Sequence, residues 1–514
     1  MRRSITLVVL ATLVGMGLMP ATPVAKADEA PSVNSPNVTH VANLRYAARP
    51  TAGGGDHPQG GTDIEFVNLP VQVGLVTKGP KKKRGPVFET REFALAGTYR
   101  NGLQIVDITD PTTPKVASVY DCWIQQGDVQ VFERDGRTYA TYTHDTGYTA
   151  TTSTTCYQEA KALGDWTDGA PQHGTFILDI TNPYEPTTVA FVPFRLGSHN
   201  QTVSPDGNFL YNSNSDLGPG ETGSSGTIEV VDISDFSEPK RTATLELTSG
   251  LNSHDITFSP DGKRAYSAAV THTLVLDTTD LAHPTIIGRI IDPAINISHQ
   301  SDPITMKDAN TGLERTFLVI TDEIAGAAGN AACPGGGLHV YDVTGDLERA
   351  PVKVGYWNIP ETTVFPPTGV GLPPRCTAHV LRMYPEQKVM TISWYAAGVR
   401  VVDISGLMGV SVGATPSTGN VGVGMKEIGY HYFTGADFGE SWSVKTNKIA
   451  DDGSFYMYSN DQRRGLDVLR FTKTATESEN PGRWLTPEEA EAELAPQKQP
   501  IDPETNAPIC LLPQ

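Results

Sequence analysis

Short runs in which hydrophobic and polar residues alternate recur along the chain and are separated by glycine, proline and aspartate. An alternation of period two predicts β-strands with one buried face. One phrase returns at intervals of tens of residues: a glycine, an apolar run, then Asp and Ile. Seven copies occur, two of them diverged, and they begin at Gly102, Gly174, Gly226, His272, Gly337, Gly398 and Gly465. This recurrence predicts a repeat architecture.

Each copy of the phrase belongs to a larger unit of four expected strands. Two alternating runs precede it, as in 254–262 and 264–270, and Pro260-Asp261-Gly262 between them is typical of a tight hairpin turn. A fourth run follows, such as 114–120. Four antiparallel strands per unit predict an all-β protein, a seven-bladed β-propeller of four-stranded antiparallel blades. We expect the Asp that closes the phrase to cap the next turn.

The phrase resembles the LVIVD repeat family, and the resemblance spans Asp63 to Phe471. Members of that family are mostly secreted β-propellers whose functions are poorly characterised. The resemblance therefore implies a fold more than a chemistry.

The two ends of the chain differ from the repeats. Arg2 and Arg3 precede an apolar run over 5–19 and a small-residue cleavage site at 25–27, so residues 1–27 predict a signal peptide and a secreted, extracytoplasmic protein. No later stretch is long and apolar enough to span a membrane. We expect an N-terminal extension over 28–62, the propeller over 63–471, and a short C-terminal helix with a flexible tail over 472–514. Either 39–46 or 465–471 is expected to close the ring of blades.

Charge and cysteine content narrow the class of protein. The chain has 58 acidic and 39 basic residues, a formal net charge of −19, which disfavours a nucleic-acid partner. Five cysteines in an exported chain predict disulfides, and the local pairs are Cys122 with Cys156 and Cys333 with Cys376, leaving Cys510. The motifs of serine hydrolases, phosphate-binding loops and zinc peptidases are absent from the sequence.

Residues with metal-ligand chemistry recur at one position of the repeat. His199 and His254 each stand eight residues before a hairpin glycine, Gly207 and Gly262. The same alignment, less secure for the last two, adds His299, His379, Asp128, Asp63 and Glu440. In a propeller the first strand of each blade is innermost, so these side chains are expected to converge at one mouth of the central channel. The alternative is that each histidine only bonds the neighbouring blade.

Four imidazoles and up to three carboxylates suit a transition metal: copper, zinc or iron. Copper is favoured because the plan is similar to exported propellers that seat copper on histidines, such as nitrous oxide reductase and the selenium-binding, methanethiol-oxidising proteins. The loops on the same face offer His144, Asp322 and Glu323 as candidate catalytic residues, and Trp394, Tyr395 and Trp442 as pocket walls. We expect ordinary surface or turn positions for the remaining repeat histidines His40, His173, His283 and His339.

Two classes of function fit these patterns. The first is a metal-dependent oxidoreductase with its metal on the histidines. The second is a non-catalytic module that binds a peptide, glycan or protein, and long inserts near 146–169 and 359–375 favour it. In either class the expected partner is a small molecule or peptide at the channel mouth. A calcium scaffold is disfavoured because calcium prefers oxygen ligands.

Overall fold

The computed structural model describes residues 31–52, 60–78, 83–144, 153–165, 173–194, 197–214, 226–248, 251–307, 311–323, 333, 335–360, 375–410 and 423–473. The predicted signal peptide, C-terminal helix and Cys510 lie outside these residues, as does the side chain of His144. Among the described residues, no helix combines the length and apolar character needed to cross a membrane.

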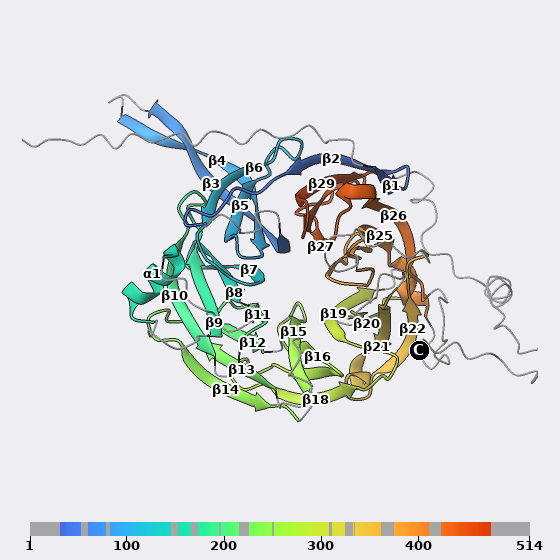
Figure 1. Ribbon diagram of the computed structural model, residues 1–514. Helices are drawn as coiled ribbons and strands as arrows, with labels where there is room; N and C mark the ends of the chain where they lie inside the picture. The colour runs from blue at the N-terminus through green and yellow to red at the C-terminus, as the bar shows by residue number, and fades with distance from the viewer. Residues whose placement is uncertain are drawn as a thin grey trace, which may run out of the picture.

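The described chain is mostly β, and its small antiparallel sheets are arranged in a ring, as Figure 1 shows. The first sheets are formed by β3 (Gly61–Lys78), β4 (Lys83–Thr98), β5 (Leu103–Asp107) and β6 (Lys115–Tyr120); β7 (Gly127–Arg134), β8 (Arg137–His144), β9 (His173–Asp179) and β10 (Thr187–Phe194); and β11 (Asn200–Val203), β12 (Phe209–Ser213), β13 (Thr227–Asp232) and β14 (Lys240–Glu246). Strands β7, β11 and β15 lie near the centre of the ring, and β10, β14 and β18 lie on its rim (Figure 1).

One sheet has eight strands and contains two consecutive runs of four. These runs are β15 (Leu251–Phe258), β16 (Arg264–Val270), β17 (Thr273–Asp277) and β18 (Thr285–Ile290), then β19 (Ser298–Lys307), β20 (Glu314–Asp322), β21 (Gly337–Asp342) and β22 (Val352–Trp357). A single register pair, Val270 with Ser298, joins β16 to β19. The two runs otherwise repeat the antiparallel order of the preceding sheets.

The N-terminal strands complete the last two sheets. These sheets contain β23 (Leu381–Tyr384), β24 (Val389–Ser393), β25 (Val399–Asp403), β26 (Lys426–Phe433) and β1 (Ser32–Asn34), and β27 (Ser441–Lys445), β28 (Phe455–Asp461), β29 (Gly465–Phe471) and β2 (Val38–Leu44). Because β2 pairs with β29, the two segments that we considered for ring closure bond to each other. The strands of the ring thus begin ahead of the propeller start expected at residue 63.

The closing Asp of the repeated phrase caps the next turn, as predicted. In six copies its Oδ1 accepts a hydrogen bond from the backbone N–H two residues later, at 2.7–3.0 Å: Asp107, Asp179, Asp232, Asp277, Asp342 and Asp403. The glycine that opens the phrase is needed where φ is positive. At Gly102 φ is +75° and a Cβ would lie 2.3 Å from the Tyr120 carbonyl oxygen.

Both predicted disulfides are present, Cys122–Cys156 and Cys333–Cys376. The first one holds a helix that the all-β prediction did not include, α1 (Thr155–Leu163), which buries Cys156, Tyr157 and Ala160. Short 3-10 turns occur at Gly345–Arg349, Ser405–Gly409 and Gly435–Asp437. The disulfides favour an extracytoplasmic location.

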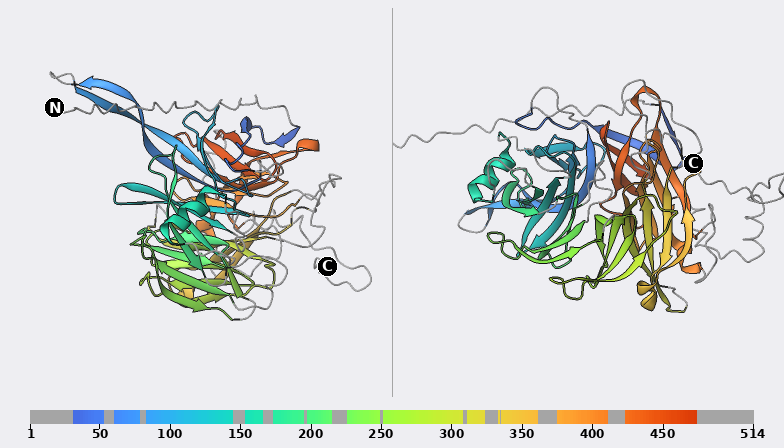
Figure 2. Two further views of the ribbon diagram at one scale, coloured as in Figure 1. Left: turned by 60° about the vertical axis from the view of Figure 1, so that its left-hand side comes forward. Right: turned by 60° about the horizontal axis from the view of Figure 1, so that its bottom comes forward.

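Hydrophobic side chains pack between neighbouring sheets rather than in one central core. One cluster contains Phe93, Ile105, Val129, Phe176 and Phe191 from β4, β5, β7, β9 and β10. Polar side chains of the innermost strands lie at the ring centre. Strands β3 and β4 also extend beyond the ring as a long two-stranded ribbon (Figure 2).

Candidate metal centre

The innermost strands have register irregularities where the candidate ligands stand. Shifts occur between Gly61 and Ile64, Leu251 and Asp255, Ser298 and Gln300, and Ser441 and Ser443. A β-bulge redirects the side chain of the extra residue. These irregularities contain Asp63, His254, His299 and Trp442. In the last sheet, therefore, Trp442 occupies the ring position to which the alignment assigned Glu440.

The structure brings the four predicted histidines together as an arc of contacting rings. The ring centroids are 4.0 Å apart for His199 and His254, 4.3 Å for His254 and His299, and 4.3 Å for His299 and His379. All four side chains are buried. Four different innermost segments thus deliver imidazoles to one place at the ring centre.

Two of these histidines have a tautomer fixed by the backbone. His254 Nδ1 lies 2.9 Å from the His299 carbonyl oxygen, and His379 Nδ1 lies 2.7 Å from the Trp442 carbonyl oxygen. A carbonyl only accepts, so each Nδ1 carries the proton and each Nε2 keeps its lone pair. The bond to the neighbouring strand, which we considered as an alternative to metal binding, is also the contact that prepares Nε2 as a ligand.

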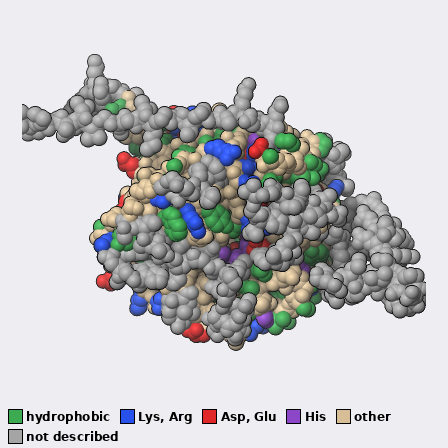
Figure 3. Space-filling model, viewed as in Figure 1, with side chains coloured by type: hydrophobic (Ala, Val, Ile, Leu, Met, Phe, Trp, Pro, Cys, Tyr) green, Lys and Arg blue, Asp and Glu red, His purple; other side chains and the backbone are tan. Residues whose placement is uncertain are grey.

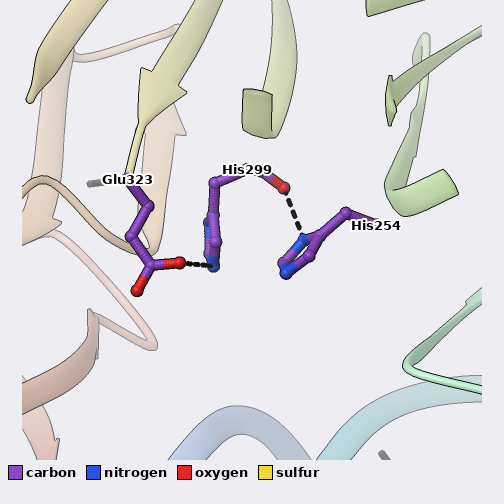
Figure 4. Close-up of side chains that lie close together, drawn as sticks. All are labelled: His254, His299 and Glu323. Carbon is purple, nitrogen blue, oxygen red and sulfur yellow. Dashed lines mark hydrogen bonds and ion pairs between the residues drawn. The ribbon is translucent and has the colours of Figure 1, made fainter. Parts of the chain in front are cut away.

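Glu323, which follows β20, places its carboxylate against this arc (Figure 4). Its Oε2 is 3.6 Å from His299 Nε2, and its Oε1 is 3.7 Å from His379 Nε2. One ligand atom each from His254, His299 and Glu323 lie within 4.8 Å of one another, and all three residues are buried. Glu323 was predicted as a catalytic residue, and it lies among the candidate metal ligands.

Tyr395 orients Glu323. Its hydroxyl donates a 2.7 Å hydrogen bond to Glu323 Oε1, and its ring centroid is 4.5 Å from that of His379. The guanidinium of Arg375 lies 4.1 Å from the Tyr395 ring centroid. Tyr395 has a φ of +42°, in a region that a non-glycine residue occupies only when its surroundings hold it there.

Burial favours the neutral form of three of the imidazoles, those of His254, His299 and His379. It lowers the pKa of His254, and the neighbouring His199 lowers it further. Burial and His379 likewise lower the pKa of His299, and burial lowers the pKa of His379 to about 3. Burial also raises the pKa of Glu323, against the Tyr395 hydrogen bond. Protons therefore compete weakly for the imidazole nitrogens at neutral pH.

The other predicted site residues have different surroundings. Asp128 accepts a hydrogen bond from the Gln201 backbone N–H at 3.0 Å, and Asp63 binds Lys445 Nζ at 2.7 Å. Glu440 accepts from the Arg375 backbone N–H at 3.2 Å. Asp322 accepts from the backbone of Asn296 and Ile297, so it holds the turn before β19. For His144 only the backbone position, the last residue of β8, is described.

The expectation of an ordinary surface or turn position is wrong for His339. Its side chain is 2 % exposed, and its Nδ1 lies 2.8 Å from Lys353 Nζ. His339 is on the strand β21, whose residues are all buried, so its place in the repeated phrase puts it inside a sheet. His283 is exposed, as expected, and the side chain of His173 is outside the described residues.

A cavity of about 410 Å³ adjoins the arc and is lined by His199, His299 and His379. It continues past charged residues that the sequence analysis did not select: Glu65, Asp255, Asp302, Arg382 and Lys445. The available signal was a charged residue inside an otherwise buried strand. Histidine and acidic side chains are visible near the centre of the face in Figure 3.

Comparison with known proteins identifies one repeat and one similar architecture. Residues 92–122, from the end of β4 through β6, match the LVIVD repeat. No curated protein matches the chain. The β-propeller domain of Cps50 (Swd1) from Myceliophteria thermophila is similar at 10 % identity, with a TM-score of 0.44, over 74 % of this chain and 93 % of that chain. The chain thus carries an LVIVD repeat, and its own strand order gives a ring of small antiparallel sheets.

Proposed function

We propose that the protein is an exported, seven-bladed β-propeller whose histidine arc binds a transition metal, with copper favoured over zinc or iron, for oxidoreductase chemistry. The observation that carries this proposal is the buried group of His254, His299 and Glu323, whose ligand atoms lie within 4.8 Å of one another. The seven-blade count takes the eight-stranded sheet as two blades joined by one residue pair.

The donor set supports a transition metal. Nitrogen ligands bind zinc at about 2.0–2.1 Å, so tetrahedral ligand atoms around one ion lie about 3.4 Å apart. The distances from Glu323 to His299 and His379, 3.6 and 3.7 Å, are already close to that spacing. Neutral imidazoles with one carboxylate suit copper, zinc and iron and are poor ligands for calcium.

Around a bound metal, the residues of this chain would have separate tasks. His254 and His379 would present Nε2, because their Nδ1 protons are engaged by carbonyl groups. Glu323 would either bind the ion or hold a proton that Tyr395 helps to position. A bound copper or iron ion would supply one-electron redox chemistry, and any of the three would act as a Lewis acid. Catalytic roles for His144 and Asp322 stay predictions.

The test is the metal content of the untagged, exported protein, measured by plasma mass spectrometry. The wild type is expected to retain near-stoichiometric copper, zinc or iron after dialysis. The variant His254→Ala/His299→Ala is expected to lose it, whereas His283→Ala, at an exposed histidine, keeps it. A wild-type protein that binds none of these metals after reconstitution contradicts the proposal.

A propeller that binds a ligand without catalysis is the second candidate. The 410 Å³ cavity beside the arc supports it, because ligand pockets have volumes of about 300–1,000 Å³. The metal-free protein would then bind the ligand as tightly as the metal-loaded protein does.

A further inference from the structure

The cavity beside the histidine arc has an excess of acidic groups. Its lining includes five carboxylates and only two permanent cations: Asp63, Glu65, Asp128, Asp255 and Asp302, with Lys445 and Arg382. All seven charged residues are buried or half-buried at the ring centre. Burial raises the pKa of Asp128 and Asp302 and raises the pKa of Asp255 to about 7, so a bound cation would favour the ionised form of all three carboxyl groups.

Both cations form their ion pairs on one side of the cavity. Lys445 Nζ lies 2.7 Å from Asp63 and 2.8 Å from Glu65, and Arg382 also pairs with Glu65. Asp63 and Glu65 are therefore neutralised by residues of the protein. Both cations also lower the pKa of Asp302 through space, but they form their ion pairs with Asp63 and Glu65.

The other side holds three carboxylates bound only to neutral donors within the described residues. Asp128 accepts the Gln201 backbone N–H, and Asp255 accepts the Ile256 backbone N–H at 2.8 Å. Asp302 accepts the Thr257 hydroxyl at 2.7 Å and the Gln300 amide at 3.1 Å. These donors leave carboxylate oxygens with further capacity to accept from a ligand.

The arc adds an imidazole ring to the wall of the same cavity. The His299 side chain is 7 % exposed, it lines the cavity, and its Nδ1 has no hydrogen-bond partner among the described residues. The remaining wall combines apolar side chains, including Val131, Val203 and Phe258, with neutral polar ones such as Gln126 and Asn200. The cavity therefore offers acidic groups, an apolar surface and the histidine arc to a single small molecule.

We propose that this cavity binds a small organic ammonium ion, with its cationic group against Asp128, Asp255 and Asp302 and its remaining part against the histidine arc. The proposal that an amine is the substrate of the oxidoreductase rests on the function proposed above. As a ligand class, it rests only on the charge and size of the cavity. Anions such as carboxylates and phosphates are excluded by the same acidic groups.

The experiment is calorimetric titration of the metal-free protein at neutral pH with three probes of one shape: benzylamine, benzyl alcohol and benzoate. Benzylamine is expected to bind at least about tenfold more tightly than benzyl alcohol, because a hydrogen bond to a charged group is stronger than one to a neutral group. No binding is expected for benzoate. Asp128→Asn and Asp255→Asn are each expected to weaken benzylamine binding about tenfold.

Asp451→Asn is the matched control, since it removes the same charge at an exposed turn and should leave binding unchanged. Thermal unfolding of each variant checks the fold, and the loss of a buried carboxylate without a cation should not destabilise it. No benzylamine binding, equal binding of benzoate, or unchanged affinity in both cavity variants overturns the inference. Because the titration uses metal-free protein, its result is independent of metal content: amine binding without metal retention contradicts only the proposed oxidoreductase.

Discussion

Histidines lie at two places in this ring of sheets, half-buried His40 at the closure and the buried central arc, and they differ in what their polar atoms contact. Where β2 closes the last sheet, His40 Nε2 lies 2.8 Å from Asp467, whose carboxylate also binds Arg464 and Asn43. In the central arc, His254 and His379 bond backbone carbonyls, and Glu323 lies 3.6 and 3.7 Å from the Nε2 atoms of His299 and His379. The polar atoms of the closure network pair with one another, whereas the Nε2 atoms of His254 and His379 in the arc keep lone pairs that can bind a metal.

The difference distinguishes a structural use of histidine from a functional one. A buried carboxylate with several charged and polar partners contributes to stability only while every partner remains. A group of imidazoles with oriented lone pairs adds little stability by itself and gains its value when a cation binds. The closure network should therefore control folding, and the arc should control metal binding.

The largest expected effect is at the closure network. Asp467→Ala removes the shared partner of His40 and Arg464 and leaves a buried guanidinium without its carboxylate partner. We expect the free energy of unfolding to fall by about 3–5 kcal/mol. Urea unfolding measures this change, and metal content per folded chain should stay at the wild-type value. A loss of metal with unchanged stability would reverse the assignment of the two regions.

Added metal should stabilise the protein only through the arc. At a free metal concentration about 100 times Kd, ligand binding to the native state raises the free energy of unfolding by about 2.7 kcal/mol. We expect this increase for the wild type and for His283→Ala, and none for His254→Ala/His299→Ala. Thermal unfolding with and without copper, under conditions that limit metal binding to the unfolded chain, provides the measurement. An equal increase in the double variant would place the metal elsewhere.

The closure region should also make stability depend on pH. Burial, reinforced by Asp467, raises the pKa of Asp461 to about 7, against an ordinary value of 3.8. Between these values the native state holds a proton that the unfolded chain has lost, so stability falls as pH rises from about 4 to about 7. From pH 5 to pH 7 the fall is about 2 kcal/mol, at 1.36 kcal/mol per pH unit. Asp461→Asn should remove this part of the dependence, and an unchanged profile would contradict it.

The sequence was sufficient for the architecture and for the histidines, because both are written in the repeat. The repeated phrase predicted the four-strand units and the capping role of Asp107 and its equivalents. Counting from the hairpin glycine aligned four histidines that the structure places in contact. Both signals are local, since they depend on strand alternation and on distances along one chain segment.

What the sequence did not reveal depends on irregular backbone and on contacts between sheets. The bulge in β27 places Trp442 at the ring, and no count from a turn reveals such a shift. Glu323 was selected for its position in a loop, but its role as a candidate ligand depends on contacts with β19 and with the segment before β23. The pairing of Lys445 with Asp63 joins residues 382 positions apart in the chain.

The smallest expected effect is at Tyr395. Its substitution tests whether the arc is oriented for metal binding or is only closely packed. Tyr395→Phe keeps the ring that packs on His379 and removes only the hydroxyl that donates to Glu323 Oε1. If that hydrogen bond orients the carboxylate toward a metal, copper affinity should fall about tenfold, the lower end of the range for residues that support metal ligands. Competition with a chelator of known affinity measures this fall, and the free energy of unfolding of the metal-free variant should change by no more than about 1 kcal/mol.

Because Tyr430→Phe removes a hydroxyl from a strand at the rim, it should leave copper affinity unchanged. Equal affinities for wild type and Tyr395→Phe would show that Glu323 needs no support, and the arc would then bind metal through its imidazoles alone.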